Sequence, residues 1–233
     1  MTAPTSRILA ALGQVRDPEL DEPITTLGFV ASCTVSTDGH AEVHLRLPTY
    51  FCAPNFAFLM VADAYDAVST VDGVRQVEVV LDDHFAADAI NGGVAAGAGF
   101  ARTFAGEAAG ELDRLRLDFL RKAVLAGTDL ACRPLVAAGA APAQLARLTL
   151  GDVPASGELD RLRRRRAELG LPAGDDAPLL IEPATGAALP ADAVPLHLRR
   201  ARLTRTGLDA NTGICRGMLR HRYQSRGEGE DGS

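Results

Sequence analysis

The stretch AEVHLRLPTYFCAPNFAFLMVADAYDAVSTVDGVRQVEVVL, residues 41–81, carries the pattern that decides the fold. Apolar and polar residues alternate over Ala41–Leu47, which predicts a strand, and apolar residues recur at helical spacing over Asn55–Val71. Val74–Leu81 alternates again and predicts another strand. A strand, a helix and a strand in this order form a β-α-β unit, whose strands run parallel and are joined by a right-handed crossover.

The residues before this unit predict one more helix and one more strand. Phe29–Ser36 is typical of a strand, and the Thr37–Gly39 turn joins it to the strand from Ala41 as an antiparallel hairpin. Ser6–Val15 has helical spacing, and Pro18 of the following segment DPEL ends that helix. The order helix, strand, strand, helix, strand predicts a small α+β domain with a three-stranded mixed sheet.

The C-terminal part of the chain predicts mostly helix. From Glu111 the chain is rich in Leu, Ala and Arg at helical spacing, and we expect Pro134 to end that helix. Further helices are expected over Glu158–Leu169 and Leu208–Tyr223, with a short strand over Leu179–Glu182. The predicted fold class is therefore α+β, with a mainly α-helical region after the sheet.

Three parts are expected along the chain. Residues 1–105 form the α+β domain with a connector, residues 106–223 form a helical accessory domain, and residues 224–233, rich in Gly and Glu, form a disordered tail. A chain of 233 residues, 47% of them hydrophobic, is long enough to bury the cores of two such domains.

The charge distribution argues against several classes of protein. The formal net charge is −6; residues 1–110 carry 5 basic and 14 acidic residues, and residues 111–233 carry 19 basic and 16 acidic ones. The acidic first half argues against a nucleic-acid surface, and the second half is too nearly balanced to favour one. No apolar run approaches the roughly 20 residues that cross a bilayer, and no signal pattern starts the sequence, so we expect a cytoplasmic protein without membrane contact.

Four cysteines, Cys33, Cys52, Cys132 and Cys215, lie far apart in the sequence. The absence of a Cys-x-x-Cys pair excludes a zinc ribbon or a thioredoxin motif, and in a reducing compartment we expect free thiols. Cys33, Cys132 and Cys215 occupy strand or helix positions where a buried core thiol is the first expectation. A role of Cys215 as a second ligand stays open.

The predicted topology brings three distant segments to one edge of the sheet. The two parallel strands end at this edge, and the antiparallel first strand begins there. Such an edge is the usual place for ligands. The candidate residues are Cys52 after the second strand, Asp82, Asp83 and His84 after the third strand, and Asp17, Glu19 and Thr26 before the first strand.

Cys52 is the strongest candidate because it lies just before a helix, in which Pro54 suits the first turn. Exposed amides and the dipole at a helix start favour an anion, so we expect the thiol to lose its proton more easily. The thiolate is the form that binds metal or attacks an electrophile. The alternative is that Cys52 is a small apolar residue in a turn.

A mixed metal site is the second hypothesis at this edge. Cys52, His84 and either Asp82 or Asp83 offer sulfur, imidazole and carboxylate ligands, which suit iron or zinc. The alternative is that the aspartates and the histidine are solvated side chains at the end of a strand.

Several segments in this order resemble a known family. They are Asp17-Pro18-Glu19, Leu27-Gly28-Phe29-Val30, the loop PTYFCAP around Cys52, and Asp72-Gly73-Val74 before the third strand. Residues 6–81 resemble the iron–sulfur assembly domain known as domain of unknown function 59, which includes cytosolic cluster-targeting factors and PaaD-type proteins. The family loop usually reads Thr-x-x-x-Cys-Pro, whereas here Thr49 stands three residues before Cys52, and Ala53 separates Cys52 from Pro54.

The resemblance implies a role in the assembly, transfer or target maturation of iron–sulfur or related iron centres, with Cys52 as the cluster-contacting residue. Because some members accompany multicomponent oxygenases, dedication to one oxygenase is an expectation by analogy. A cluster usually takes four cysteines or their substitutes. We therefore expect an iron–sulfur cluster or iron to be held transiently, in an arrangement shared across a homodimer or with glutathione.

Three functional hypotheses follow. The first is a non-enzymatic assembly or carrier factor, whose partner is a client metalloprotein or an assembly scaffold protein. The second is a metal-free, client-specific chaperone for a diiron oxygenase, which depends on exposed apolar residues of the C-terminal half. The third is an enzyme with Cys52 and His84 as nucleophile and base. No oxyanion or substrate-pocket pattern accompanies that pair, so we do not expect an enzyme.

Overall fold

The computed structural model describes residues 3–104 and 109–227, and the chain forms two compact units. The first unit comprises residues 1–113 and 210–233, and the second comprises residues 114–209. The sequence placed residues 106–223 in one accessory domain, whereas the structure groups residues 210–223 with the sheet-containing unit. The last helix, α9 (Val194–Gly227), therefore belongs half to one unit and half to the other.

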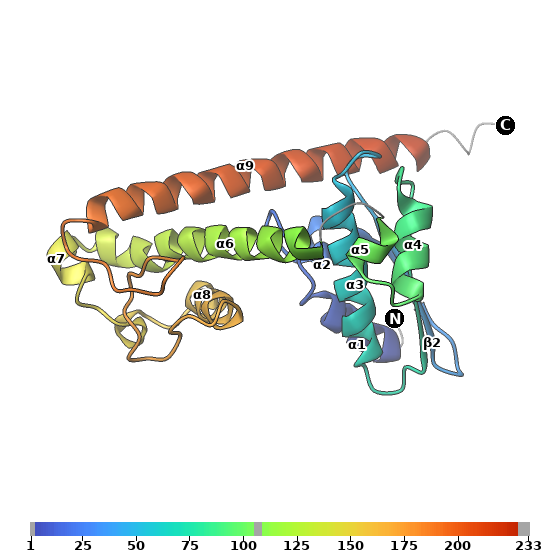
Figure 1. Ribbon diagram of the computed structural model, residues 1–233, viewed down its shortest axis with the longest axis horizontal. Coiled ribbons are helices and arrows are strands. Elements are labelled where there is room, and N and C mark those ends of the chain that lie inside the picture. Colours follow the sequence, from blue (N-terminus) through green and yellow to red (C-terminus); the bar gives the residue numbers. More distant parts are fainter. Residues whose placement is uncertain (1–2, 105–108, 228–233) are drawn as a thin grey trace. The chain divides into compact units, whose positions relative to one another are not determined.

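The first unit contains the predicted three-stranded mixed sheet, and the α+β fold class is confirmed (Figure 1). β1 (Val30–Val35) pairs antiparallel with β2 (His40–Arg46), and β2 pairs parallel with β3 (Gln76–Asp82). The parallel register ends with Arg46 opposite Asp82. The two parallel strands therefore finish side by side, as the sequence predicts.

Helices α1 (Ala3–Leu12) and α3 (Pro54–Ser69) pack with the sheet of this unit. α1 contacts β1, and α3 crosses from the end of β2 to the start of β3 and contacts β3. The short α2 (Ile24–Leu27) ends at Gly28, whose φ of 79° suits glycine. The core between these elements is built from buried residues such as Ile8, Leu12, Phe29, Val43, Leu45, Phe58, Val61 and Leu81.

The connector after β3 forms two helices, α4 (Ala87–Ala95) and α5 (Phe100–Thr103). Asn91 of α4 accepts a hydrogen bond from the Leu81 N–H at 2.9 Å and donates one to the Leu81 carbonyl at 3.2 Å. The Asn91 amide thereby takes the place of a neighbouring strand at the outer edge of β3. This contact fixes the start of the connector against the end of the sheet.

The second unit is mainly helical, as predicted. It contains most of α6 (Ala109–Ala137), α7 (Pro142–Leu145), a 3₁₀ turn (Leu150–Asp152), α8 (Gly157–Glu168) and the first half of α9. The predicted strand over residues 179–182 is wrong, because within this segment the structure has only one isolated bridge, between Ile181 and Ala188.

Pro134 does not end α6, which continues to Ala137. Proline has no N–H to donate to the carbonyl four residues earlier, that of Leu130, but its fixed φ is compatible with a helix, so the residues after it can continue the helix. The Ala138 N–H still donates to the Pro134 carbonyl at 3.0 Å. The prediction that Pro134 terminates the helix is therefore wrong by one turn.

A buried arginine joins α8 to the loop that follows it in the second unit. Arg166 is 0% exposed and donates to the carbonyls of Pro178 at 2.8 Å and Leu179 at 2.6 Å. Burial lowers the pKa of Arg166 to about 10. The two carbonyls accept hydrogen bonds from the two terminal nitrogens of this buried guanidinium.

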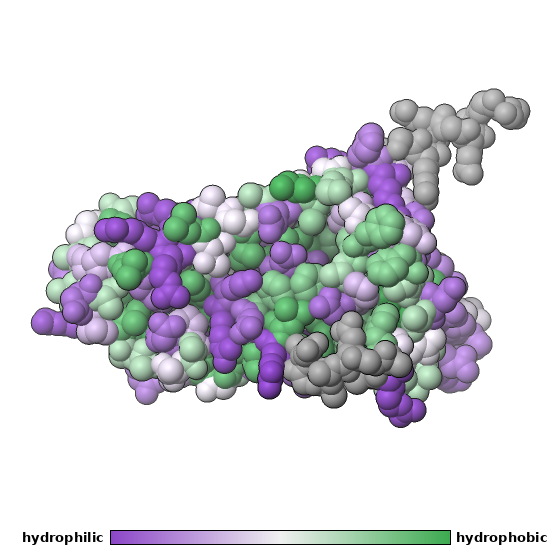
Figure 2. All heavy atoms as spheres, turned by 45° about the horizontal axis from the view of Figure 1, so that its top comes forward, coloured by the Kyte–Doolittle hydropathy of each residue, from purple (hydrophilic) through white to green (hydrophobic). Residues whose placement is uncertain are grey.

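The predicted disordered tail is helical where the structure describes it. α9 extends to Gly227, so residues 224–227 are helical, and residues 228–233 lie outside the described residues. Within the described ranges, no helix is long and apolar enough to cross a membrane. The face of the molecule drawn in Figure 2 carries hydrophilic and hydrophobic residues side by side.

We expect Arg166→Ala to lower the free energy of unfolding of the full chain by roughly 3 kcal/mol, because two buried carbonyls lose their donor. Urea unfolding followed by circular dichroism measures this change. Arg164→Ala on the same helix is the matched control, since Arg164 is exposed and should cost about 0.5 kcal/mol or less. Equal effects of the two substitutions would contradict the structural role of Arg166.

Candidate functional site

Cys52 lies in the loop between β2 and α3, at the sheet edge where both parallel strands end. Its side chain is half-buried, and its Sγ lies 3.3 Å from Thr49 Oγ1, a hydrogen bond in which either atom can donate. Ala53 precedes α3 without a side-chain cap, and Pro54 occupies the first turn, as the sequence predicts. Thr49 is thus the polar neighbour of the thiol within its own loop.

His84 connects the Cys52 loop to the end of β3. It is buried; its Nε2 donates to the Cys52 carbonyl at 2.8 Å, and its Nδ1 accepts from the Ala86 N–H at 3.2 Å. Burial lowers the pKa of His84, and the nearby Arg222 guanidinium contributes to the same direction. Both ring nitrogens of the neutral imidazole are therefore used to hold backbone groups in place.

Asp82 and Asp83 have different partners. Asp82 Oδ1 lies 3.0 Å from His44 Nδ1, and Glu42 contacts the other ring nitrogen of His44 at 3.0 Å. Glu42, with a further contribution from Asp82, raises the pKa of His44. Asp83 adopts a positive φ of 52° and forms an ion pair with Arg222 at 2.9 Å.

The structure therefore brings Cys52 and His84 together through the backbone and engages Asp82 and Asp83 elsewhere. Among residues 3–104 and 109–227, no group of three or more His, Cys, Asp or Glu side chains is arranged to hold a metal ion. The four-residue ligand set stays a prediction, and of its members Cys52 is the residue whose side chain offers the soft ligand that iron and clusters favour.

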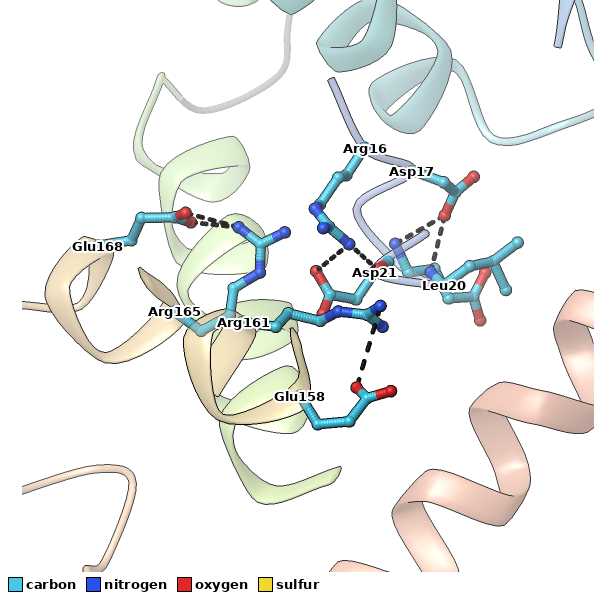
Figure 3. Close-up of polar contacts among 9 residues, drawn as sticks. Arg16, Asp17, Leu20, Asp21, Glu158, Arg161, Arg165 and Glu168 are labelled. Carbon is cyan, nitrogen blue, oxygen red and sulfur yellow. Dashed lines mark hydrogen bonds and ion pairs between the residues drawn. The ribbon is translucent and has the colours of Figure 1, made fainter. Parts of the chain in front are cut away.

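Asp17 orders the third segment at this edge. Its carboxylate accepts hydrogen bonds from the N–H groups of Glu19 at 2.9 Å and Leu20 at 2.8 Å, and Figure 3 shows the resulting turn. Burial raises the pKa of Asp17 to about 6, against the opposite effect of these two hydrogen bonds. Across the same turn, Arg16 and Asp21 form an ion pair at 3.7 Å.

The C-terminal half of α9 contacts the same edge, which the sequence did not reveal. Arg222 donates to the Leu47 carbonyl at 3.0 Å and also to the Asp83 carbonyl. The guanidinium of Arg46, the last residue of β2, lies 4.9 Å from the centre of the Tyr223 ring. Helical periodicity identifies a packing face of α9 but carries no information on its partner, so these contacts had no signal in the sequence.

Three aromatic side chains form an exposed cluster beside the Cys52 loop. Tyr50 and Phe51 precede Cys52, and Phe85 follows His84. Ring centres lie 5.0 Å apart for Tyr50 and Phe51 and 5.9 Å apart for Phe51 and Phe85. Phe51 is 76% exposed. We call Tyr50, Phe51 and Phe85 the aromatic cluster.

The sheet and the Cys52 loop lie in a region shared with known proteins. Residues 5–79 match the family described as iron–sulfur cluster assembly protein. An uncharacterized protein of Methanocaldococcus jannaschii is 30% identical over 84 residues, which are 36% of this chain and 86% of that protein. This chain belongs to the iron–sulfur cluster assembly protein family. The resemblance stated from the sequence is confirmed.

A crystal structure of a domain of unknown function 59 from Bacillus anthracis is also similar to this chain. It is 30% identical, and the match covers 34% of this chain and 74% of that domain, with a TM-score of 0.32. Membership of the iron–sulfur cluster assembly family supports a general role in assembling such clusters. The matched family region ends at residue 79, so His84, Cys215 and Arg222 lie outside it.

We expect the lowered pKa of His84 to make the fold less stable in acid. In the unfolded chain His84 has its ordinary pKa of 6.5, so the unfolded state binds the proton first as the pH falls. Stability from this group is present above pH 6.5 and is lost below it, and urea unfolding at pH 8 and pH 5 measures the loss. In His84→Gln the difference in the free energy of unfolding between pH 8 and pH 5 should be smaller than in the wild type.

His44→Gln is the matched control for this experiment. The raised pKa of His44 stabilises the fold below pH 6.5 and loses this effect as the pH rises through the folded value. The His44→Gln variant should therefore lose more free energy of unfolding between pH 8 and pH 5 than the wild type does. A His84→Gln variant with the full wild-type pH dependence would contradict the role given to His84.

Proposed function

We propose that this chain binds an iron–sulfur cluster, or iron, transiently at Cys52 and passes it to a client metalloprotein in the cytoplasm. The observation that carries the proposal is the position of Cys52, a half-buried thiol at the edge where β2 and β3 end. Thr49 lies beside it, and both residues fall within the family region. Thiolate sulfur is a ligand that iron and iron–sulfur clusters favour.

An incomplete ligand set suits a carrier. Clusters that stay in a protein usually have four cysteine ligands or substitutes, and a family domain that offers Cys52 leaves most positions to other molecules. We propose that a second copy of the chain, a scaffold, glutathione or the client supplies the remaining ligands. An iron–sulfur cluster or iron held in this way can leave by ligand exchange, because the client has to replace few metal–sulfur bonds to this chain.

The aromatic cluster is the surface that we propose to contact the client during transfer. Tyr50 and Phe51 immediately precede Cys52 in the sequence, and Phe85 immediately follows His84 and lies beside Tyr50. Aromatic residues are enriched in protein interfaces, since they bury a large area with few rotatable bonds. Contact at this position would exclude water from the cargo while it changes ligands.

Dedication to one multicomponent oxygenase is the narrower form of the proposal. The alternative is a metal-free chaperone for a diiron oxygenase, and the exposed apolar residues on α9, among them Leu196, Leu203 and Ile214, favour keeping it as a second candidate. A carrier requires the Cys52 thiol, whereas a chaperone that holds no metal tolerates its replacement by serine. The two functions are therefore separable by one substitution.

Anaerobic reconstitution with iron and sulfide tests the carrier function. We expect the wild-type chain to gain the visible absorption of an iron–sulfur cluster with stoichiometric iron, and Cys52→Ser to lose it, because a hydroxyl replaces the thiolate ligand. Cys33→Ser is the matched control, since Cys33 is also half-buried but lies on β1. It should keep the absorption.

Absence of bound iron in the wild-type protein would contradict the carrier function and favour the metal-free chaperone. Loss of the cluster in Cys33→Ser as well as in Cys52→Ser would show a general loss of folded protein. Circular dichroism of each variant before reconstitution separates these outcomes.

We expect Phe51→Ser to slow cluster transfer to an apo-client by roughly tenfold while leaving cluster assembly intact, because the aromatic cluster loses its most exposed ring. Transfer is followed by the change in visible circular dichroism when cluster moves to an apo-ferredoxin. Leu203→Ser is the control, since Leu203 is 73% exposed but belongs to the second unit. Equal transfer rates in the wild type and Phe51→Ser would refute a role of the aromatic cluster.

A further inference from the structure

The C-terminal half of α9 presents one face to the candidate site. Cys215, Leu219 and Arg222 are four and three residues apart, which places them on the same side of a helix. Leu219 is buried in the core of the first unit. A Cβ added at Gly28 would lie 3.3 Å from Leu219 Cδ2, so Leu219 packs closely against the turn between α2 and β1. This contact fixes the side of α9 that faces the sheet edge.

Arg222 fixes the position of the helix along that edge. It donates to the carbonyl of Leu47, which follows β2, and forms its ion pair with Asp83, which follows β3. These two segments lead to Cys52 and to His84, respectively. Cys215 lies two helical turns before Arg222, about 10.5 Å along the axis, on the same face. The anchors of α9 therefore hold Cys215 on the side of the helix that faces the first unit.

The Cys215 side chain packs into the first unit. Its thiol is half-buried and packs against the same hydrophobic core as Cys52. Burial raises the pKa of Cys215 to about 11, and negative charge on Asp17, Cys52 and Glu19 adds to the effect. Gly28 before β1 lies against Leu219, and Leu47 after β2 accepts from Arg222, so the segment before β1, the loop after β2 and α9 meet in one region.

Cys33 provides a contrast within the same unit. It is also half-buried and packs against the same core. Burial raises the pKa of the Cys33 thiol, and among the described residues no neighbouring carboxylate or thiol contributes to that change. Cys33 therefore has the surroundings of a core thiol, whereas Cys215 lies on the face of α9 whose Arg222 contacts the segments that lead to Cys52 and His84.

We propose that Cys215 is a second thiolate ligand at the Cys52 site, so that one chain offers two sulfur atoms to a soft metal ion or to a cluster. This inference rests on the proposed function, since it names a ligand for the same cargo. The second thiol comes from α9, outside the matched family residues 5–79. The helix thereby adds to the family domain a ligand that the domain itself does not contain.

Metal binding by two thiols is balanced by the release of two protons. A divalent cation takes the place of one proton on each sulfur, which forms two metal–sulfur bonds and needs no oxidant or reductant. Two thiolates still leave half of a cluster's usual four positions for the client or another thiol. The cargo remains exchangeable, but it is held by two bonds at the moment of transfer.

Titration of the full-length chain with Cd²⁺ under reducing conditions tests the inference without iron chemistry. We expect the ultraviolet absorption of cadmium thiolate to fall to about half of the wild-type value in Cys215→Ser and in Cys52→Ser, because one of two sulfur ligands is lost. Affinity measured by calorimetry should fall about tenfold or more in both variants. Cys33→Ser should match the wild type.

A wild-type absorption and affinity in Cys215→Ser would overturn the inference. Alkylation supplies a measurement that requires no substitution: in the wild-type chain, Cd²⁺ should protect Cys52 and Cys215 from iodoacetamide together, as seen by mass spectrometry of the peptides. Protection of Cys52 without Cys215 would also overturn it. This measurement stands even where Cys215→Ser fails to fold.

The inference and the proposed function fail in different ways. Cadmium binding through both thiols, together with no iron–sulfur cluster after reconstitution, would support the dithiol site and refute the carrier function. A cluster that forms equally well in the wild type and in Cys215→Ser, with unchanged cadmium binding, would support the carrier function and refute the dithiol site.

Discussion

The parallel pairing of β2 with β3 determines where Cys52 and His84 lie. Because α3 returns the chain to the start of β3, the loop with Cys52 and the segment with His84 leave the sheet at the same edge. A slip of two residues in this register would move the two segments about 7 Å apart along the strands. The hydrogen bond from His84 to the Cys52 carbonyl, 2.8 Å long, would then be lost.

The sequence was sufficient for the topology and for Cys52. Alternation and helical spacing are local patterns, and the handedness of a β-α-β crossover is a general rule, so the shared edge followed from residues 41–81. It was not sufficient for the partners of the polar side chains. His84 uses both ring nitrogens on backbone groups, and Asp82 turns to His44, and these choices depend on side-chain directions that spacing alone does not give.

The contribution of α9 is the part that sequence reasoning missed. Its apolar residues predicted a helix over residues 208–223, and the structure confirms helix there but extends it to Val194–Gly227. The pairing of Arg222 with Asp83 joins residues 139 positions apart, as does the contact of Arg222 with the Asp83 carbonyl. One sequence contains no record of which distant segment a helix face meets. The same reason explains why Cys215 was placed in a helix core with its further role left open.

The order of the chain gives α9 a consequence for biosynthesis. The sheet, its helices and Cys52 are synthesised first, then the second unit, and the helix half that bears Cys215 and Arg222 leaves the ribosome after both. Residues 1–113 can begin to fold as soon as they emerge, yet Arg222 is not there to pair with Asp83 until the second unit has been made. Translation that stops inside the second unit therefore yields a chain that has Cys52 but lacks the helix half that contacts Leu47 and Asp83.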